Sequence, residues 1–334
     1  MSLSAAIPDR RMRAATVIGL ASVLLLLALA FACAVGAVRI PPSDVLDALG
    51  DRSDPVTRQI VWQIRFPRVL VAALVGANLG IAGVVLQGIT RNPLGDPHIL
   101  GFSAGAGVAA VGLLRIAPDV PLALVPAAAF AGALASAALV YALAWRDGIS
   151  PVRFALAGVA VAALFTALST ALIATSALFT QAALSFLAGG LYQRGWEHVH
   201  QVWPYTLVGG VIAVMVADSL NVLALGDDVA RGLGMRVERT RALLAALAAV
   251  LTGAAVAVAG LVAFVGLVVP HVSRLLVGSD QRVVLPLSAV LGALLLVASD
   301  SVARVIVAPS EIPVGIVTAV VGAPVLLLLI RTRI

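Results

Sequence analysis

Four histidines, one cysteine and 16 acidic residues are the side chains of this chain that could bind a metal or move a proton. The histidines lie apart, at positions 98, 198, 200 and 271, and only the stretch W-E-H-V-H brings two of them close to a carboxylate, Glu197. A structural zinc site needs four such ligands and a catalytic site three, so this stretch supplies at most part of one. No nucleophile–base pair stands out, and we expect neither a catalytic residue nor a metal site.

The sequence also lacks the means to bind ATP phosphates in a P-loop. All 22 basic residues are arginine, whereas the phosphate-binding motif G-x-x-x-x-G-K-[ST] requires a lysine. This chain therefore does not supply a Walker A phosphate cradle. We therefore predict a non-enzymatic protein that binds no cofactor of its own.

The composition indicates what surrounds these residues. Of the 334 residues, 61% are hydrophobic and 11% are charged, against about 25% charged residues in a typical soluble domain. Apolar runs recur from Ala14 to Ile330, and a run of about 20 residues crosses a bilayer as a helix. The longest polar stretch, 39–68, is too short for a soluble catalytic domain. We predict an all-α polytopic membrane protein, with residues 1–334 forming a single transmembrane domain.

The apolar runs predict ten helices. Their expected ranges are 14–38, 66–89, 97–114, 120–145, 152–174, 201–217, 239–262, 266–277, 283–299 and 313–330. Several are short for a full crossing, as in transporters built from two repeats around a central pathway.

A pair of Pro-His dipeptides supports such a repeat. Pro97-His98 opens the expected third helix about thirty residues after Arg65, and Pro270-His271 breaks the eighth about thirty residues after Arg239, at matching places in two halves. Helices two to five (66–174) and seven to ten (239–330) then form two repeats of inverted topology. Residues 14–38 are the first helix, 201–217 the sixth, and 218–238 the loop between the sixth helix and the second repeat.

Arginines are distributed unevenly about these helices. With both termini in the cytoplasm, 14 of the 22 arginines lie inside and eight outside, in the direction of the positive-inside rule. This orientation places the 218–238 loop in the cytoplasm. It places the 39–65 and 300–312 segments outside.

Several motifs together carry a family resemblance. R-F-P-R (65–68) precedes a glycine-spaced span that ends in R-N-P-L-G-D-P-H (91–98). Further along are L-G-D-D-V-A-R-G-L-G-M (225–235), V-G-L-V-V-P-H-V-S-R-L-L (265–276) and E-I-P-V-G (311–315). Over nearly its whole length the chain resembles the FecCD-type permeases, the membrane subunits of ABC importers for iron-siderophores, haem and cobalamin.

The resemblance implies the type II importer permease fold, in the bacterial cytoplasmic membrane. Two permease copies, or this chain and a paralogue, would surround a central pathway. Separate ATP-binding cassette ATPase subunits would bind ATP and Mg²⁺, and an extracytoplasmic substrate-binding protein would deliver the cargo. A ferric siderophore is the expected cargo, with haem and cobalamin as alternatives.

A proton- or sodium-driven secondary transporter is the competing class. Such a protein should carry paired carboxylates in the middle of the membrane. The acidic residues here lie at helix ends or in loops, and Asp218 and Asp300 are the deepest of them.

Three arginines are candidates for contact with the binding protein. By resemblance, Arg65, Arg68 and Arg304 would meet acidic residues on that protein, for which the bidentate guanidinium is suited. The alternative for arginines at helix ends is that they extend to lipid headgroups.

The strongest candidate site is the cytoplasmic loop. By resemblance it contains the coupling helix that sits in a groove of the ATPase, and the residues assigned to this contact are Gly226, Asp227, Asp228, Ala230, Leu233, Gly234 and Met235. Asp227 and Asp228 suit a helix N-terminus. The plainer interpretation is a capped surface helix.

Two further features carry weaker predictions. By resemblance, Ser150, Pro151 and Val152 at the start of the fifth helix form the cytoplasmic gate, although Ser-Pro also simply caps a helix. Gly76-x-x-x-Gly80 predicts a face where two helices approach closely. Asn78 and Gln87 on the same helix either bond to neighbouring helices or line the pathway.

Overall fold

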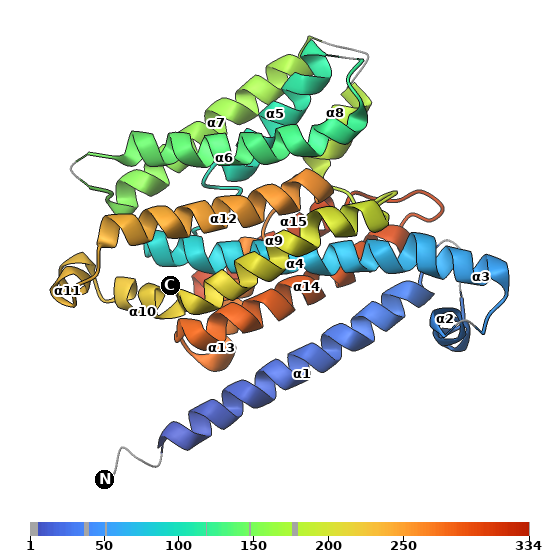
Figure 1. Cartoon of the computed structure of the whole chain (residues 1–334), viewed down its shortest axis with the longest axis horizontal. Coiled ribbons are helices and arrows are strands. Elements are labelled where there is room, and N and C mark those ends of the chain that lie inside the picture. Colours follow the sequence, from blue (N-terminus) through green and yellow to red (C-terminus); the bar gives the residue numbers. More distant parts are fainter. Residues whose placement is uncertain are drawn as a thin grey trace.

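The computed structural model describes residues 6–36, 40–50, 52–117, 119–146, 148–175 and 180–333. In these ranges the chain forms helices and turns, with one isolated β-bridge between Trp145 and Ile149 (Figure 1). The elements are α1 (Ala6–Ala34), α2 (Pro42–Leu49), α3 (Pro55–Gln59), the π-helical turn η1 (Ile60–Arg65), α4 (Phe66–Thr90), α5 (Phe102–Ile116), the 3-10 turn η2 (Leu122–Leu124), α6 (Val125–Ala144), α7 (Pro151–Ala174), α8 (Thr180–Ala188), α9 (Trp196–Met215), α10 (Ala217–Ala224), α11 (Asp227–Gly232), α12 (Val237–Ala259), α13 (Val265–Val277), α14 (Gln281–Val305) and α15 (Val314–Arg333).

The described helices include the ten expected membrane segments. Six are long and apolar enough to cross a bilayer, namely α1, the continuous α3–α4 rod, α6 with η2, α7, α12 and α14. The helices α9 and α10 make one more span, bent by 50°, and α5, α13 and α15 are shorter apolar helices. The prediction of an all-α polytopic membrane protein is therefore confirmed.

Two helices form the centre of the bundle. In both α4 and α12, 78% of the most apolar window is buried, against 22% in α1 and 17% in α7. Figure 1 shows α4 and α12 running side by side through the middle, with α1 on one edge and α6 and α7 on the opposite one. α4 and α12 are the first helices of the two expected repeats. The repeats therefore pack against each other through their first helices.

The two repeats also share a local feature after these helices. The short helix α5 starts after Gly101, which has a φ of 82°, and the short helix α13 starts after Phe264, with a φ of 68°. A left-handed residue reverses the chain direction at both places and lets a new helix begin inside the bundle. The match agrees with the inverted repeats expected from the sequence.

Small residues set the distance between α4 and its neighbours. A Cβ atom added to Gly76 would lie 2.2 Å from the carbonyl oxygen of Gly292 in α14, and one added to Gly83 would lie 2.0 Å from that of Gly266 in α13. Such backbone contact is possible only without a side chain. The predicted close-packing face of Gly76 and Gly80 is thereby confirmed, since Gly80 similarly faces Ser288.

Several helix boundaries differ from the sequence prediction. Pro97-His98 does not open the third helix, which begins at Phe102. The carboxylate of Asp96 instead accepts a hydrogen bond of 2.8 Å from the His98 backbone N–H and holds these residues in a turn, as aspartate often does. Pro270 lies within an unbroken α13. The first helix ends at Ala34, and residues 37–38 of its expected range lie outside the described residues.

Candidate functional site

The three arginines expected to dock a binding protein lie together where α4 begins and α14 ends. Arg65, Arg68 and Arg304 are only 6%, 7% and 5% exposed. Arg68 donates to Asp300 at 2.8 Å and is 2.9 Å from Glu311, and Arg304 is 3.1 Å from the second oxygen of Asp300. Asp300, 1% exposed, therefore lies between two arginines. Many of the guanidinium N–H groups of these arginines therefore bond to other residues of this chain.

Two of these arginines bind the end of α1. Arg65 donates to the carbonyl oxygens of Cys33 and Ala34 at 2.8 and 2.9 Å, and Arg304 donates to that of Val35 at 2.9 Å. The last carbonyls of a helix have no partner within the helix and carry partial negative charge. The arginines satisfy them and fasten α1 to α4 and α14. The π-helical turn η1 ends at Arg65, directly before α4.

Arg68 also borders an open hollow of about 890 Å³. Its other polar walls come from the loop after α8 and the start of α9, with Arg194, Glu197 and His198, and from Glu311 beyond α14. The Arg194 guanidinium lies 2.9 Å from the Nε2 atom of His198. This hollow presents both charge signs at the same end of the bundle as α2 and α3.

A short helix, α11, forms where the coupling helix was expected, and it lies at the opposite end of the bundle (Figure 1). Asp227 is the first residue of α11, as predicted, and Gly234 has a φ of 82°, which favours glycine. Leu233 is 65% exposed, Val229 is 48% exposed, and Asp228 is exposed. These side chains give α11 a free face with apolar and acidic character.

Three other residues of the coupling prediction face the chain itself, whereas a Cβ added to Gly226 or Gly234 would meet no atom within 4 Å. Ala230 is fully buried, Met235 packs against the main core, and Asp227 points toward α12. There Asp227 accepts two hydrogen bonds from Arg241, at 2.7 and 2.8 Å, and a short one from Arg91. Burial alone would raise the pKa of Asp227, but its bonds to Arg241 and Arg91 outweigh burial and hold the pKa below its usual range.

The expected gate residues lie at the beginning of α7. Pro151 is its first residue and Ser150 its N-cap, as predicted, although the Ser150 side chain makes no capping bond. Val152 is 65% exposed. The turn before the helix is held by a hydrogen bond of 3.0 Å from Arg153 to the carbonyl of Gly148.

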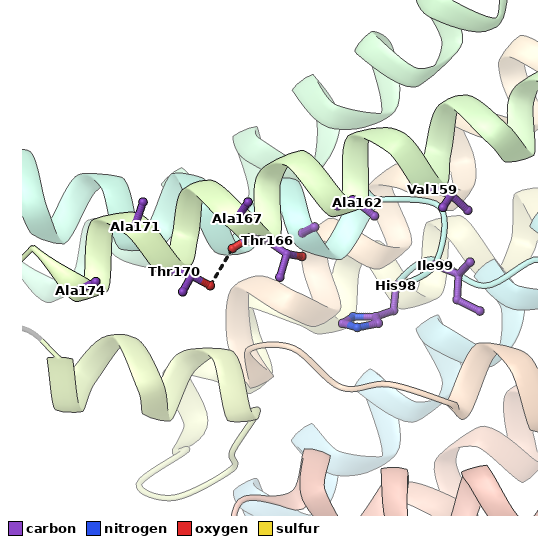
Figure 2. A pocket seen from close by; sticks show the side chains of 11 residues that line it. His98, Ile99, Val159, Ala162, Thr166, Ala167, Thr170, Ala171 and Ala174 are labelled. Atoms are coloured by element: carbon purple, nitrogen blue, oxygen red, sulfur yellow. Dashed lines mark hydrogen bonds between the residues drawn. The ribbon is translucent and has the colours of Figure 1, made fainter.

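A second open hollow, of about 810 Å³, lies against α7. Its walls are alanine-rich, and its polar side chains are His98 from the turn before α5 and Thr166 and Thr170 from α7 (Figure 2). The Thr170 hydroxyl bonds back to the Thr166 carbonyl at 3.0 Å, whereas the His98 imidazole projects from its loop beside α7. A large, mostly apolar cargo could bind here with few fixed polar contacts.

The carboxylates named for an ion-coupled transporter do not form a pair. Asp218 lies in the first turn of α10 and its side chain is 63% exposed beside Arg282, whereas Asp300 lies near the far end of α14 between two arginines. Gln87 donates to the carbonyls of Gly266 and Leu267 at 3.2 Å, so its amide binds a neighbouring helix, one of the two roles expected for it. Asn78 is buried, and its amide has no hydrogen-bond partner among the described residues.

The sequence motifs assign no site role to two members of these clusters, Arg241 and Glu311. An arginine within the first turns of a predicted span was a usable signal, because a charge at such depth needs a partner. Arg91 gave no comparable signal, since it lies in a loop.

The chain is similar in sequence to a known family of transport proteins. Residues 24–332 match the model of the FecCD transport family. The chain is 46% identical over 281 residues to the cobalamin import system permease protein BtuC of Halobacterium salinarum, covering 84% of this chain and 75% of that protein. It is 38% identical over 311 residues to the Fe(3+)-citrate import system permease protein YfmE of Bacillus subtilis, covering 93% of each.

A solved structure is similar over nearly the whole fold. It was described as an inward-facing conformation of a putative metal-chelate type ABC transporter. The similarity has a TM-score of 0.85 at 30% identity and covers 95% of this chain and 99% of that one.

Proposed function

The chain belongs to the FecCD transport family, and on that premise we propose that it is the permease subunit of an ABC importer that carries a ferric siderophore or a related metal chelate into the cytoplasm. The family match over residues 24–332 is the observation that carries this proposal. An iron-citrate permease aligned over 93% of both chains favours an iron chelate. The 46% identity to a cobalamin permease makes cobalamin the second candidate, and haem is the third.

The partners follow from this role. Two ATPase subunits supply ATP hydrolysis with Mg²⁺, a second permease copy or paralogue completes the pathway, and a binding protein delivers cargo at the outer face. The exposed face of α11 with Asp228 and Leu233 contacts the ATPase, and the exposed face of α7 contacts the second permease. Residues 1–334 act as one transmembrane domain of the cytoplasmic membrane with both termini inside, because this orientation puts α11 on the ATPase side.

Docking of the binding protein belongs at the opposite end, around Arg65, Arg68 and Arg304. Of these three arginines, Arg68 is the one that lines the open hollow there, and Glu311 lines it too. In this arrangement the arginines hold the outer ends of α1, α4 and α14 in place. The binding protein contacts the surface formed by these helix ends.

Reconstituted transport tests the function. This chain, its ATPase and its binding protein are placed in liposomes with ATP inside, and uptake of ferric citrate, a ferric hydroxamate, haem and cobalamin is compared. We expect uptake of one of them that requires both ATP and the binding protein. Uptake that follows a proton gradient without the ATPase would contradict the proposal, and the accepted cargo decides between iron chelate and cobalamin.

The hollow beside α7 makes a second prediction. Ala167→Phe adds an aromatic ring to its wall, and we expect uptake to fall by roughly tenfold or more because the bulk excludes cargo. Leu27→Phe on the exposed surface of α1 is the matched control and should transport normally. Equal uptake by both variants would place the cargo elsewhere.

A further inference from the structure

Arg241 is a fully buried charge near the beginning of α12. Only 1% of the residue is exposed, and it is among the largest completely buried side chains in the described part of the chain. A buried guanidinium is stable only when its charge is paired with an opposite charge. The partners of the Arg241 guanidinium therefore fix its position.

The guanidinium joins two segments that are far apart in sequence. One bond of 2.7 Å runs from Nη2 to Asp227, the first residue of α11. Nη1 donates both to the other oxygen of Asp227 at 2.8 Å and to the carbonyl oxygen of Ile149 at 2.7 Å. Ile149 directly precedes Ser150, the N-cap of α7.

The segments around this bridge are in close contact with one another. Ile149 is 4% exposed, and its β-bridge with Trp145 closes the turn between α6 and α7. A second connection runs from Arg231 of α11 to Glu238 at 2.9 Å, and a Cβ added to Gly148 would lie 2.9 Å from the same Glu238 oxygen. The start of α12 thus lies between α11 and the turn that leads into α7.

Asp227 is also held from the other side. Arg91, just beyond α4, pairs with it and donates to the Leu223 carbonyl of α10 at 2.8 Å. A displacement of α11 must therefore either shift Arg241 or separate a carboxylate from two arginines. Separating a buried charge from its partner is the costly outcome, so Arg241 moves with Asp227.

We propose that Arg241 is the positioning residue that transmits movement of α11 to the beginning of α7, through its simultaneous bonds to Asp227 and the Ile149 carbonyl. The inference rests on the proposed function, in which α11 contacts the ATPase, and on the family expectation that Ser150, Pro151 and Val152 at the start of α7 form the cytoplasmic gate. Ion-pair networks with discrete arrangements can carry such coupling between sites. Arginine suits the task because its planar fork binds a carboxylate and a carbonyl in fixed directions.

The test compares ATP hydrolysis with cargo uptake in one preparation. Arg241→Lys keeps the charge but removes the fork, and we expect uptake per ATP to fall roughly tenfold while ATP hydrolysis continues. Arg282→Lys, in the exposed ion pair with Asp218 at the same end of the bundle, is the matched control and should keep the wild-type ratio. An unchanged ratio in Arg241→Lys would overturn the inference.

A second readout follows the movement itself. The single native cysteine is replaced in Cys33→Ala, and a spin label is attached to the thiol introduced by Val152→Cys, at a position that is 65% exposed. We expect trapping of ATP on the ATPase to shift the label spectrum in the parent chain and not in Asp227→Asn, a milder variant in case Arg241→Lys does not fold. The same shift in both chains would also overturn the inference.

The two levels of failure are distinguishable. If the wild-type complex shows no ATP-dependent uptake, the proposed function fails and the relay fails with it. If the wild type transports and the variants keep its ratio and its label response, only the relay is wrong.

Discussion

Asp300→Ala should lower the stability of the purified protein by about 3 to 5 kcal/mol, the usual cost of removing one partner from a buried ion pair. The carboxylate binds Arg68 at 2.8 Å and Arg304 at 3.1 Å, and all three residues are less than one-tenth exposed. Without it, Arg304 has no direct ion pair with another carboxylate of the described residues, and Arg68 keeps its pair with Glu311. Unfolding by SDS in mixed micelles measures the change.

The matched control is Asp218→Ala. Asp218 also pairs with an arginine, Arg282, but both side chains are 63% exposed. Exposed pairs contribute little because water already solvates both charges, so this variant should unfold like the wild type. A small effect of Asp300→Ala would mean that the arginines find other partners, and the cluster would then be better explained as a docking surface alone.

Gly76→Val should be nearly as damaging for a steric reason. Its Cβ would lie 2.2 Å from the Gly292 carbonyl oxygen, which belongs to backbone and cannot rotate away. Overpacking in a close-packed interior costs up to about 3 kcal/mol and sometimes more. We expect α4 and α14 to separate, seen as earlier SDS unfolding and as loss of monodisperse protein in gel filtration.

Gly19→Val provides the control for this change. Gly19 lies in α1, and a Cβ there would meet no other atom within 4 Å. It is the same substitution in a helix of similar composition, so any general effect of valine on helix stability is removed. Wild-type behaviour of Gly76→Val would show that the two helices can separate at little cost.

The sequence allowed prediction of the number and order of helices because each crossing needs a long apolar run. It also located α11, since Asp227 and Gly234 mark a short helix and its end. The segment 39–65 was expected only as an external loop. It contains α2, α3 and η1, which are each too short to give a clear pattern.

The direction in which side chains face could not be predicted in the same way. A helix that is apolar on all sides carries no stripe to mark its buried face, and α4 is of this kind over most of its length. Whether Arg65 and Arg68 point outward or into the bundle therefore depends on partners such as Asp300, which is 232 residues further along the chain. The same holds for Arg241, whose contact with Ile149 spans 92 residues.

The arginine cap on α1 has a consequence for the order of synthesis. One of its donors, Arg65, follows α1 closely, but Arg304 lies 269 residues beyond the Val35 carbonyl that it binds. At about 5–20 residues per second of translation, the ribosome delivers Arg304 some tens of seconds after α1 has been made. The outer end of α1 must therefore wait at the membrane surface half-capped, with water or lipid headgroups on the Val35 carbonyl, until α14 arrives. The first helix made is among the last to be fixed in place.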